Sequence, residues 1–116
     1  MEGTLVTSIW DRRHGYRHVR RPGAEQFLKE MARNKYEIVI WSSNVANFSY
    51  PIFDSLVGEL EQQWFFHRLT KENMKNGCIK DLSRIPRDLR KVIVIDDDPD
   101  AVQLHPDNAI IIKKFE

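Results

Sequence analysis

The chain has 116 residues, the length of one domain, and apolar residues make up 41% of it, as in a soluble globular protein. The formal net charge is +1, so no global field favours nucleic acid or an anionic membrane. A single cysteine, Cys78, excludes an internal disulfide and a cysteine-based zinc site.

No apolar run approaches the roughly 18 residues of a membrane span, and the start lacks the features of a signal or transit peptide. These features indicate either a cytosolic protein or a piece of a longer one. Residues 4–7 look like the tail of a strand whose first half is absent, which favours a piece.

Residues 11–21 are strongly basic, and we interpret them as a solvated loop or edge strand rather than a binding surface. Pro22 and Gly23 then open a predicted helix, because proline suits a first helical turn. Its apolar face should consist of four side chains at helical spacing, namely Ala24, Phe27, Leu28 and Met31.

Residues 36–41 are rich in isoleucine and valine and predict a buried strand. Ser42, Ser43 and Asn44 follow it, so their hydroxyls and backbone N–H groups could bind an anion at the end of the strand. A turn or a helix N-cap is the structural alternative for these residue types. We expect the next helix to bury four side chains, Tyr50, Phe53, Leu56 and Val57.

Residues 64–66 form a third apolar stretch, and residues 68–79 contain the turn signal Asn76-Gly77. This signal between apolar residues predicts a β-hairpin with an exposed, lysine-rich tip. Residues 84–91 read as a short connector with about one helical turn.

Residues 92–95 are four β-branched aliphatics, and Asp96, Asp97 and Asp98 follow them directly. Such a run predicts a parallel strand buried on both faces. Ligands bind at the carboxyl ends of strands in open α/β sheets, so this acidic cluster could hold a metal or a cation. The alternative is a simple turn, with Pro99 opening the next helical segment. A helical turn at 98–104 and a last strand at 109–112 complete a predicted α/β fold with right-handed crossovers.

Three strand ends thus offer hydroxyls (Ser42, Ser43), an ammonium (Lys80) and carboxylates (Asp96, Asp97). Together these groups could bind a phosphate and Mg²⁺. Aspartyl-phosphate chemistry also needs a nucleophilic carboxylate on the first strand, and this chain shows none there.

This order of motifs resembles the haloacid-dehalogenase superfamily, in the branch of phosphatases that act on the polymerase C-terminal domain. Those enzymes carry Asp-x-Asp-x-Thr on the first strand, and residues 4–6 look like the end of that motif with Glu2 at its second aspartate. The resemblance implies a three-layer sandwich with a mainly parallel sheet, an inserted β-hairpin and a truncated first strand. It makes Ser42, Lys80, Asp96 and Asp97 vestigial phosphatase positions, with a vestigial Mg²⁺ site possible but no cofactor expected.

Within that branch, several short motifs of this sequence resemble those of the presequence-receptor family of the mitochondrial inner-membrane TIM translocase. They lie at residues 14–17, 21–24, 36–44, 79–82, 87–89, 95–99 and 106–110. The resemblance implies one partial, non-catalytic receptor domain over residues 1–116, facing the intermembrane space. The targeting, membrane-spanning and first-strand segments of such receptors would lie outside it.

Such receptors bind presequence-bearing precursors and pass them to the channel subunit, without nucleic acid and with membrane contact only through their missing anchor. The family's protruding hairpin corresponds by this resemblance to residues 69–79, which look a few residues shorter than usual. The implied partner-binding residues are Leu69, Lys71, Asn73, Lys75, Asn76, Gly77 and Asp81, and no metal ligand is implied.

A presequence is a basic amphipathic helix, so its receptor needs an apolar groove with nearby carboxylates. The candidate acids are Asp96, Asp97, Asp98, Asp100, Glu59 and Glu61, and the exposed apolar candidates are Trp64, Phe65 and Leu69. We interpret Trp41, Phe53 and Phe66 as core. We therefore hypothesise that the chain binds basic amphipathic peptides weakly and in a salt-sensitive manner. The rival functions are a Mg²⁺-dependent aspartyl-phosphate phosphatase and a scaffold that acts through the hairpin alone.

Overall fold

The computed structural model describes residues 1–58 and 66–116, with two helices and six strands among them. The helices are α1 (Ala24–Arg33) and α2 (Ala46–Val57). The strands are β1 (Val6–Asp11), β2 (Gly15–Arg20), β3 (Ile38–Trp41), β4 (Phe66–Leu69), β5 (Val94–Asp96) and β6 (Ala109–Ile111). Short 3₁₀ helices punctuate the second half: η2 (Lys71–Asn73), η3 (Leu82–Arg84), η4 (Leu89–Lys91), η5 (Pro99–Val102) and η6 (Pro106–Asn108). No helix in this described part is long and apolar enough to cross a membrane.

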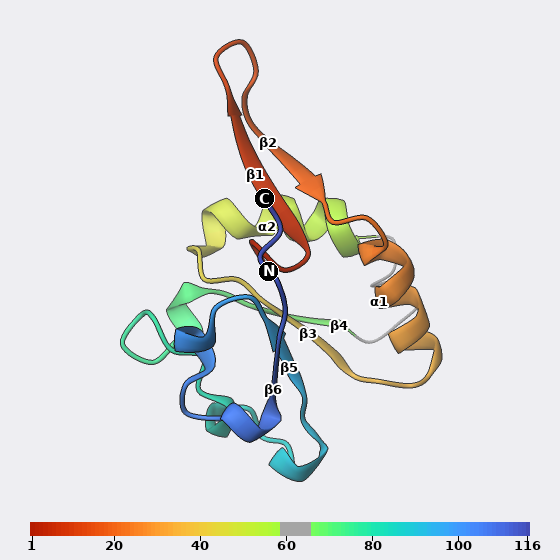
Figure 1. The fold of residues 1–116 in the computed structure, drawn as a ribbon, viewed down its shortest axis with the longest axis vertical. Helices are drawn as coiled ribbons and strands as arrows, with labels where there is room; N and C mark the ends of the chain where they lie inside the picture. Colours follow the sequence, from red (N-terminus) through yellow and green to blue (C-terminus); the bar gives the residue numbers. More distant parts are fainter. Residues whose placement is uncertain (59–65) are drawn as a thin grey trace.

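The strands pair two by two, and the predicted parallel α/β arrangement is present. β3 pairs with β4 and β5 with β6, both in parallel, whereas β1 and β2 form an antiparallel hairpin. The N-terminal residues link the two parallel pairs. The Met1 amino group donates to the Trp41 carbonyl at the end of β3 (3.0 Å), and the Gly3 carbonyl accepts from Phe115 N–H beyond β6 (2.7 Å). The two chain ends therefore lie side by side near the centre of the molecule (Figure 1).

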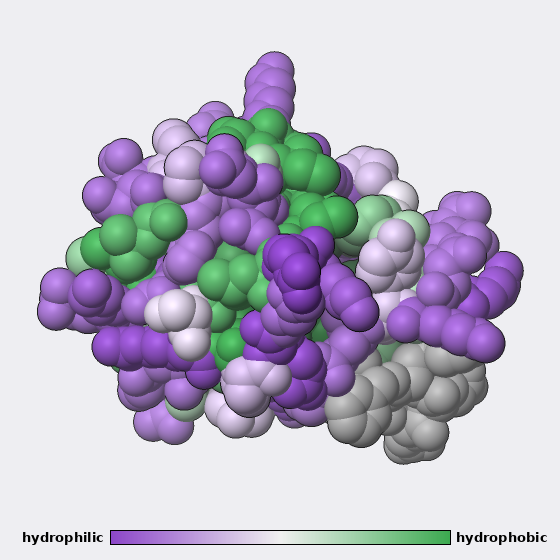
Figure 2. Space-filling view, turned by 90° about the horizontal axis from the view of Figure 1, so that it is seen from below, coloured by the Kyte–Doolittle hydropathy of each residue, from purple (hydrophilic) through white to green (hydrophobic). Residues whose placement is uncertain are grey.

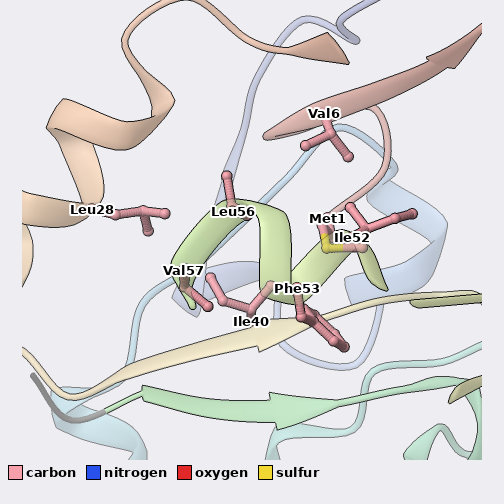
Figure 3. Close-up of a cluster of buried hydrophobic side chains, with 8 residues drawn as sticks. All are labelled: Met1, Val6, Leu28, Ile40, Ile52, Phe53, Leu56 and Val57. Atoms are coloured by element: carbon pink, nitrogen blue, oxygen red, sulfur yellow. The ribbon is translucent and has the colours of Figure 1, made fainter. Parts of the chain in front are cut away.

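The larger core cluster lies around α2 (Figure 3). The helix buries four side chains on one side, Ile52, Phe53, Leu56 and Val57. They pack against residues from other parts of the chain: Met1, Val6 of β1, Leu28 of α1 and Ile40 of β3. Helical spacing of the apolar residues explains this face. The prediction was wrong for Tyr50, which is 45% exposed, because Ile52 occupies the buried face and the Tyr50 ring stacks edge-on against Phe53 instead.

The predicted helix at α1 is confirmed, but its buried stripe is narrower than expected. Ala24, Leu28 and Ala32 are buried, whereas Phe27 is 40% exposed. Its three buried residues recur every fourth position, so Phe27 lies at the edge of the helix face that meets the core.

The prediction that residues 92–95 are buried on both faces was wrong. Val92 and Val94 pack against a second core cluster of Trp41, Met74 and Leu82, but Ile93 is 64% exposed and Ile95 36%. Alternate residues of a strand point to opposite sides, so only one face of β5 is covered within the described residues. Seen from below, the surface of the molecule shows hydrophobic patches among hydrophilic residues (Figure 2).

Of the hairpin expected over residues 68–79, the structure contains only the tip at residues 75–79. Lys75 and Ile79 exchange two backbone hydrogen bonds around Asn76 (φ 54°) and Gly77 (φ 68°), as the turn signal indicated. Leu69 instead belongs to the parallel strand β4, and a 3₁₀ turn follows it.

The hairpin that projects from the body is β1–β2, in the basic segment for which the sequence predicts a solvated loop or edge strand (Figure 1). Its turn is held by Asp11, whose Oδ1 accepts from the N–H groups of Arg13 (2.6 Å) and His14 (3.3 Å), and by Gly15 at φ 71°. An aspartate that bonds to its own turn and a glycine with positive φ are sufficient to close such a loop.

Gly3 gives a test of how tightly the N-terminal segment fits. Its φ is 77°, and a Cβ there would lie 2.5 Å from Oδ2 of Asp97. Gly3→Ala should lower the free energy of unfolding by about 1–2 kcal/mol from the backbone conformation alone. Displacement of Asp97 from its hydrogen bond with Thr4 should add about 1 kcal/mol.

Gly23→Ala is the matched control, because Gly23 also has positive φ (85°) but no atom lies within 4 Å of its built Cβ. Urea unfolding should give the larger loss for Gly3→Ala. Equal losses in the two variants would mean that the contact with Asp97 does not constrain the fold.

Candidate functional site

Ser42 lies at the end of β3, as predicted, but its hydroxyl is used inside the protein. The residue is fully buried, and its Oγ accepts from the Ser49 hydroxyl (2.8 Å) and from Asn44 N–H (3.1 Å). Ser49 belongs to α2, so this contact ties the turn after β3 to the helix that follows. Of the two alternatives for this segment, the geometry matches the structural turn.

Lys80 and Asp96 come together as expected and form a buried ion pair. Lys80 Nζ lies 2.6 Å from Asp96 Oδ2, and each residue is 3% exposed. The other oxygen of Asp96 accepts from Asp98 N–H (3.0 Å). Burial by itself raises the pKa of Asp96, but the charge and hydrogen bond of Lys80 outweigh it and hold that pKa below its usual value. The carboxylate of Asp96 therefore stays ionised beside Lys80.

Asp97 and the Met1 amino group complete this polar cluster. Asp97 Oδ1 accepts from the Thr4 hydroxyl (2.9 Å), and Thr4 is itself buried. Burial and the nearby charge of Lys80 lower the pKa of the Met1 amino group to about 5, although Asp96 and Asp97 oppose this shift. The N-terminal residue thus occupies the space between the ends of β3 and β5.

The cluster does not fit a magnesium ion as it stands. Within residues 1–58 and 66–116, no three or more His, Cys, Asp or Glu side chains converge on one point. Asp96 uses one oxygen for Lys80 and the other for a backbone N–H, and Asp97 holds Thr4. A hexacoordinate oxygen site would require these contacts to break.

The residues expected to bind partners divide into two kinds. Lys71, Lys75 and Asn76 are exposed around the small hairpin tip that Gly77 completes. Asn73 and Asp81 serve the fold: Asn73 Oδ1 accepts from Thr70 N–H (2.9 Å), and Asp81 accepts from Ser83 and contacts His105 (3.1 Å). The Ser83 and His105 hydrogen bonds lower the pKa of Asp81 to about 2. The predictions for Glu59, Glu61, Trp64 and Phe65 lie outside the described residues.

Leu69 lines a groove that the sequence did not predict. A cavity of about 440 Å³ lies beside β3 and β4, and residues 84–87 form its other wall. Its apolar lining is Val39, Trp41, Leu69, Ile85 and Pro86; its polar lining is Glu37, His67, Glu72, Asn73, Arg84 and Arg87. The expected acids Asp96, Asp97, Asp98 and Asp100 do not line it. Side chains alternate between the two faces of a strand, so the sequence could have predicted that Glu37, Val39 and Trp41 share one face of β3. Their proximity to Arg87 depends on the fold and is not visible in the sequence.

Two carboxylates flank this groove and both stay ionised. Glu37 accepts two hydrogen bonds from the Arg87 guanidinium (2.7 and 2.9 Å), which lower the pKa of Glu37. Glu72 accepts from the Thr70 hydroxyl and from Ala46 N–H, and these bonds lower the pKa of Glu72. The groove therefore has an apolar floor and a rim on which one acid is paired with an exposed arginine.

The β1–β2 hairpin is a second exposed surface. Ile9, Trp10, Tyr16 and Val19 are exposed hydrophobics on it, and Trp10 stacks edge-on against Tyr16 with ring centroids 4.9 Å apart. Its arginines add positive charge around these rings. Exposed aromatic and arginine side chains are the residue types that dominate binding energy at protein interfaces.

Comparison with solved structures places the fold. The chain resembles the RNA polymerase II C-terminal-domain phosphatase Fcp1, with a TM-score of 0.74 at 23% identity, covering 96% of this chain and 31% of that one. The fission yeast Fcp1-R271A structure with beryllium fluoride gives a TM-score of 0.73 at 24% identity over the same shares. These likenesses confirm the predicted fold class.

Curated relatives are closer in sequence. The chain is 43% identical over 119 residues to the mitochondrial import inner membrane translocase subunit TIM50 of Phytophthora infestans, covering 99% of this chain and 27% of that protein. It is 41% identical over 113 residues to TIM50 of Candida glabrata, covering 95% and 23%. The chain thus spans about a quarter of the length of these relatives. The model of the NLI interacting factor-like phosphatases matches residues 1–116, so this chain belongs to that family.

Proposed function

We propose that this chain is the receptor part of a mitochondrial import subunit of the inner membrane. In this function its domain faces the intermembrane space, binds the presequences of precursor proteins and hands them to the translocase channel. The similarity to proteins named TIM50 supports the assignment to import. The groove beside β3 and β4 supports peptide binding.

The groove is the observation that carries this proposal. A presequence has one apolar and one basic face, and a helix of this kind binds by laying its apolar face into a hydrophobic groove. Val39, Trp41 and Leu69 supply an apolar wall on the sheet, and Ile85 and Pro86 face them. Glu37 and Glu72 supply carboxylates at the rim beside Arg84 and Arg87, and such rim charges mainly orient a ligand and speed its association.

A phosphatase activity is the weaker candidate, because the residues at the phosphatase positions are engaged in structural contacts. Lys80, which would neutralise a phosphoryl group, is buried against Asp96, and Ser42 is buried against Ser49. Asp97 is held by Thr4. Phosphoryl transfer needs a carboxylate aligned with the phosphorus, and the carboxylates near Lys80 already have partners.

Arg87 gives a sharp test of the groove. Because the Arg87 guanidinium donates two hydrogen bonds to the Glu37 carboxylate, a basic peptide must compete with Arg87 for that carboxylate. Arg87→Ala should therefore tighten the binding of a fluorescently labelled presequence peptide by about two- to fivefold, the worth of a mostly exposed ion pair. Glu72→Gln should weaken the same binding.

Arg90→Ala is the control, since Arg90 also pairs with a carboxylate, Asp88 (3.0 Å), but lies outside the groove. It should leave the affinity unchanged. The affinity should fall as salt is raised. A salt-independent affinity, or equal effects of the two arginine variants, would count against the groove as the peptide site.

Asp96→Asn distinguishes a structural from a catalytic role of the polar cluster. The purified chain should not hydrolyse an aryl phosphate with Mg²⁺ present, and the variant should instead be less stable by about 3–5 kcal/mol, because Lys80 loses its buried partner. Turnover by the parent chain that the variant abolishes would favour the phosphatase.

The pH dependence has a defined sign. The folded-state pKa of Asp96 lies below its unfolded value, so its contribution to stability is complete above the unfolded pKa of about 4. It should disappear as the pH falls through the lower folded-state pKa. Thermal unfolding between pH 6 and pH 2 should show a smaller decline for Asp96→Asn than for the parent.

The projecting β1–β2 hairpin is the better candidate for contact with the channel subunit than the small tip at residues 75–79. Trp10→Ser together with Tyr16→Ser should weaken pull-down of the channel subunit's soluble segment at least about tenfold. The presequence peptide should bind this variant normally. Deletion of residues 71–76 is the comparison: if it alone abolishes channel binding, the contact lies at the small tip instead.

A further inference from the structure

Arg87 binds the Glu37 carboxylate in the way that a ligand arginine would. Its Nε lies 2.7 Å from Glu37 Oε1 and its Nη2 lies 2.9 Å from Oε2, so two hydrogen bonds join the guanidinium to both carboxylate oxygens. Arginine alone among the side chains offers such a rigid planar fork of donors. Both residues line the groove, so a peptide that enters the groove reaches the same carboxylate.

The contact between Arg87 and Glu37 is one that a ligand can replace. The side chain of Arg87 is 46% exposed and that of Glu37 is 33% exposed, and ion pairs with this exposure contribute little to stability. The wall has backbone support of its own, because Arg87 N–H donates to the Ile85 carbonyl (2.7 Å). The guanidinium makes one further bond, from Nη1 to the neighbouring Pro86 carbonyl (2.9 Å). The side chain can therefore leave Glu37 without breaking a backbone hydrogen bond of the wall.

The net charge of the groove does not select its ligand. In the described part of the chain the lining holds two carboxylates, two arginines and one histidine: Glu37, Glu72, Arg84, Arg87 and His67. The acids and arginines balance, so a cation gains affinity only from individual contacts. Glu72 already accepts from the Thr70 hydroxyl and from Ala46 N–H, which are bonds within the fold. Glu37 is the carboxylate whose hydrogen bonds come from an exchangeable side chain.

Hydrogen-bond geometry distinguishes the two cationic side chains that a basic peptide can offer to Glu37. Lysine and arginine each carry one charge, but the lysine ammonium is a compact point charge that does not match both carboxylate oxygens at once. A peptide arginine that displaces Arg87 exchanges like for like, whereas a peptide lysine loses one of two aligned bonds. His67 Nε2 lies 3.7 Å from Glu37 Oε2 and is a neighbour of the ligand in either case.

We propose that Glu37 is the specificity-determining residue of the groove and selects a peptide arginine over a lysine, with Arg87 as the internal placeholder that this arginine displaces. This inference rests on the presequence-binding function proposed above. It adds a requirement on the ligand. Glu37 lies just before β3, in line with Val39 and Trp41, so the ligand must carry an arginine next to its apolar stripe.

Two labelled presequence peptides test the selection. They share one sequence, except that every basic residue is arginine in the first and lysine in the second. Both residues have similar helix propensity, so the two peptides differ mainly in the geometry of their donors. Fluorescence anisotropy should show that the parent chain binds the arginine peptide at least about twofold more tightly. In Arg87→Ala the preference should rise to about three- to fivefold, because the arginine peptide no longer competes for Glu37.

A double-mutant cycle between peptide and chain locates the contact. Glu37→Gln should bring the ratio of the two affinities to about one, because glutamine is uncharged and presents a single acceptor oxygen. Glu30→Gln is the matched control, since Glu30 also pairs with an arginine, Arg33 (3.0 Å), but lies on α1 outside the groove. This control should keep the ratio of the parent chain. Circular dichroism melting should show that the variants remain folded.

The remaining outcomes separate this inference from the proposed function. Equal binding of the two peptides to the parent chain and to Arg87→Ala would overturn the selection but leave peptide binding in place. Binding of neither peptide would overturn the proposed function and the selection with it. A preference that persists in Glu37→Gln and disappears in Glu72→Gln would overturn the assignment to Glu37. If Glu37→Gln does not fold, the comparison of the two peptides on the parent chain and on Arg87→Ala still decides.

Discussion

The buried pair between Lys80 and Asp96 holds the second half of this protein together. Each ion would cost several kcal/mol to remove from water alone, and their contact at 2.6 Å offsets that cost only because the surrounding bonds are also made. The backbone supplies them: Lys80 N–H donates to the Ala101 carbonyl, and Asp98 N–H donates to Asp96. The pair therefore fixes the long connection from β4 to β5 against the end of β5 and the 3₁₀ turn η5.

The groove depends on the same constraint. Its outer wall, residues 84–87, follows Lys80 by a few residues and is anchored by the burial of Leu82 against Trp41 and Met74. Arg87 then reaches back to Glu37 beside β3 and closes the wall against the sheet. The buried Lys80–Asp96 pair can thus position an apolar groove on a different part of the surface.

The sequence predicted those features that depend on local patterns. Part of the buried face of α1 and much of that of α2 followed from helical spacing, and β3 and β5 followed from runs of β-branched residues. Asn76-Gly77 marked a real turn, because both residues adopt the positive φ that this pair favours. Lys80 and Asp96 were expected to lie near each other in a phosphate site, and they do meet, but as an ion pair, with Lys80 after the small turn at residues 75–79 and not at the end of a parallel strand.

The failures concern features that depend on what lies next to an element. A run of aliphatic residues cannot report whether both of its faces are covered, so the exposure of Ile93 and Ile95 was not predictable from β5 alone. The basic segment was predicted only as a solvated loop or edge strand, and its hairpin was not recognised, because Asp11 and Gly15 are a weaker turn signal than Asn-Gly. Glu37 and Arg87 are fifty residues apart, and only the packing of the 84–87 wall against β3 brings them into contact.

Two exposed surfaces differ in their chemistry. The groove has an apolar floor with both carboxylates and arginines in its lining, and the β1–β2 hairpin joins aromatic rings to arginines. Because charge complementarity selects partners mainly by excluding wrong ones, these surfaces need not compete for a single ligand. The proposed receptor function requires separate contacts for the peptide and for its neighbours. The distance along the chain between the groove residues and the β1–β2 hairpin is compatible with that requirement.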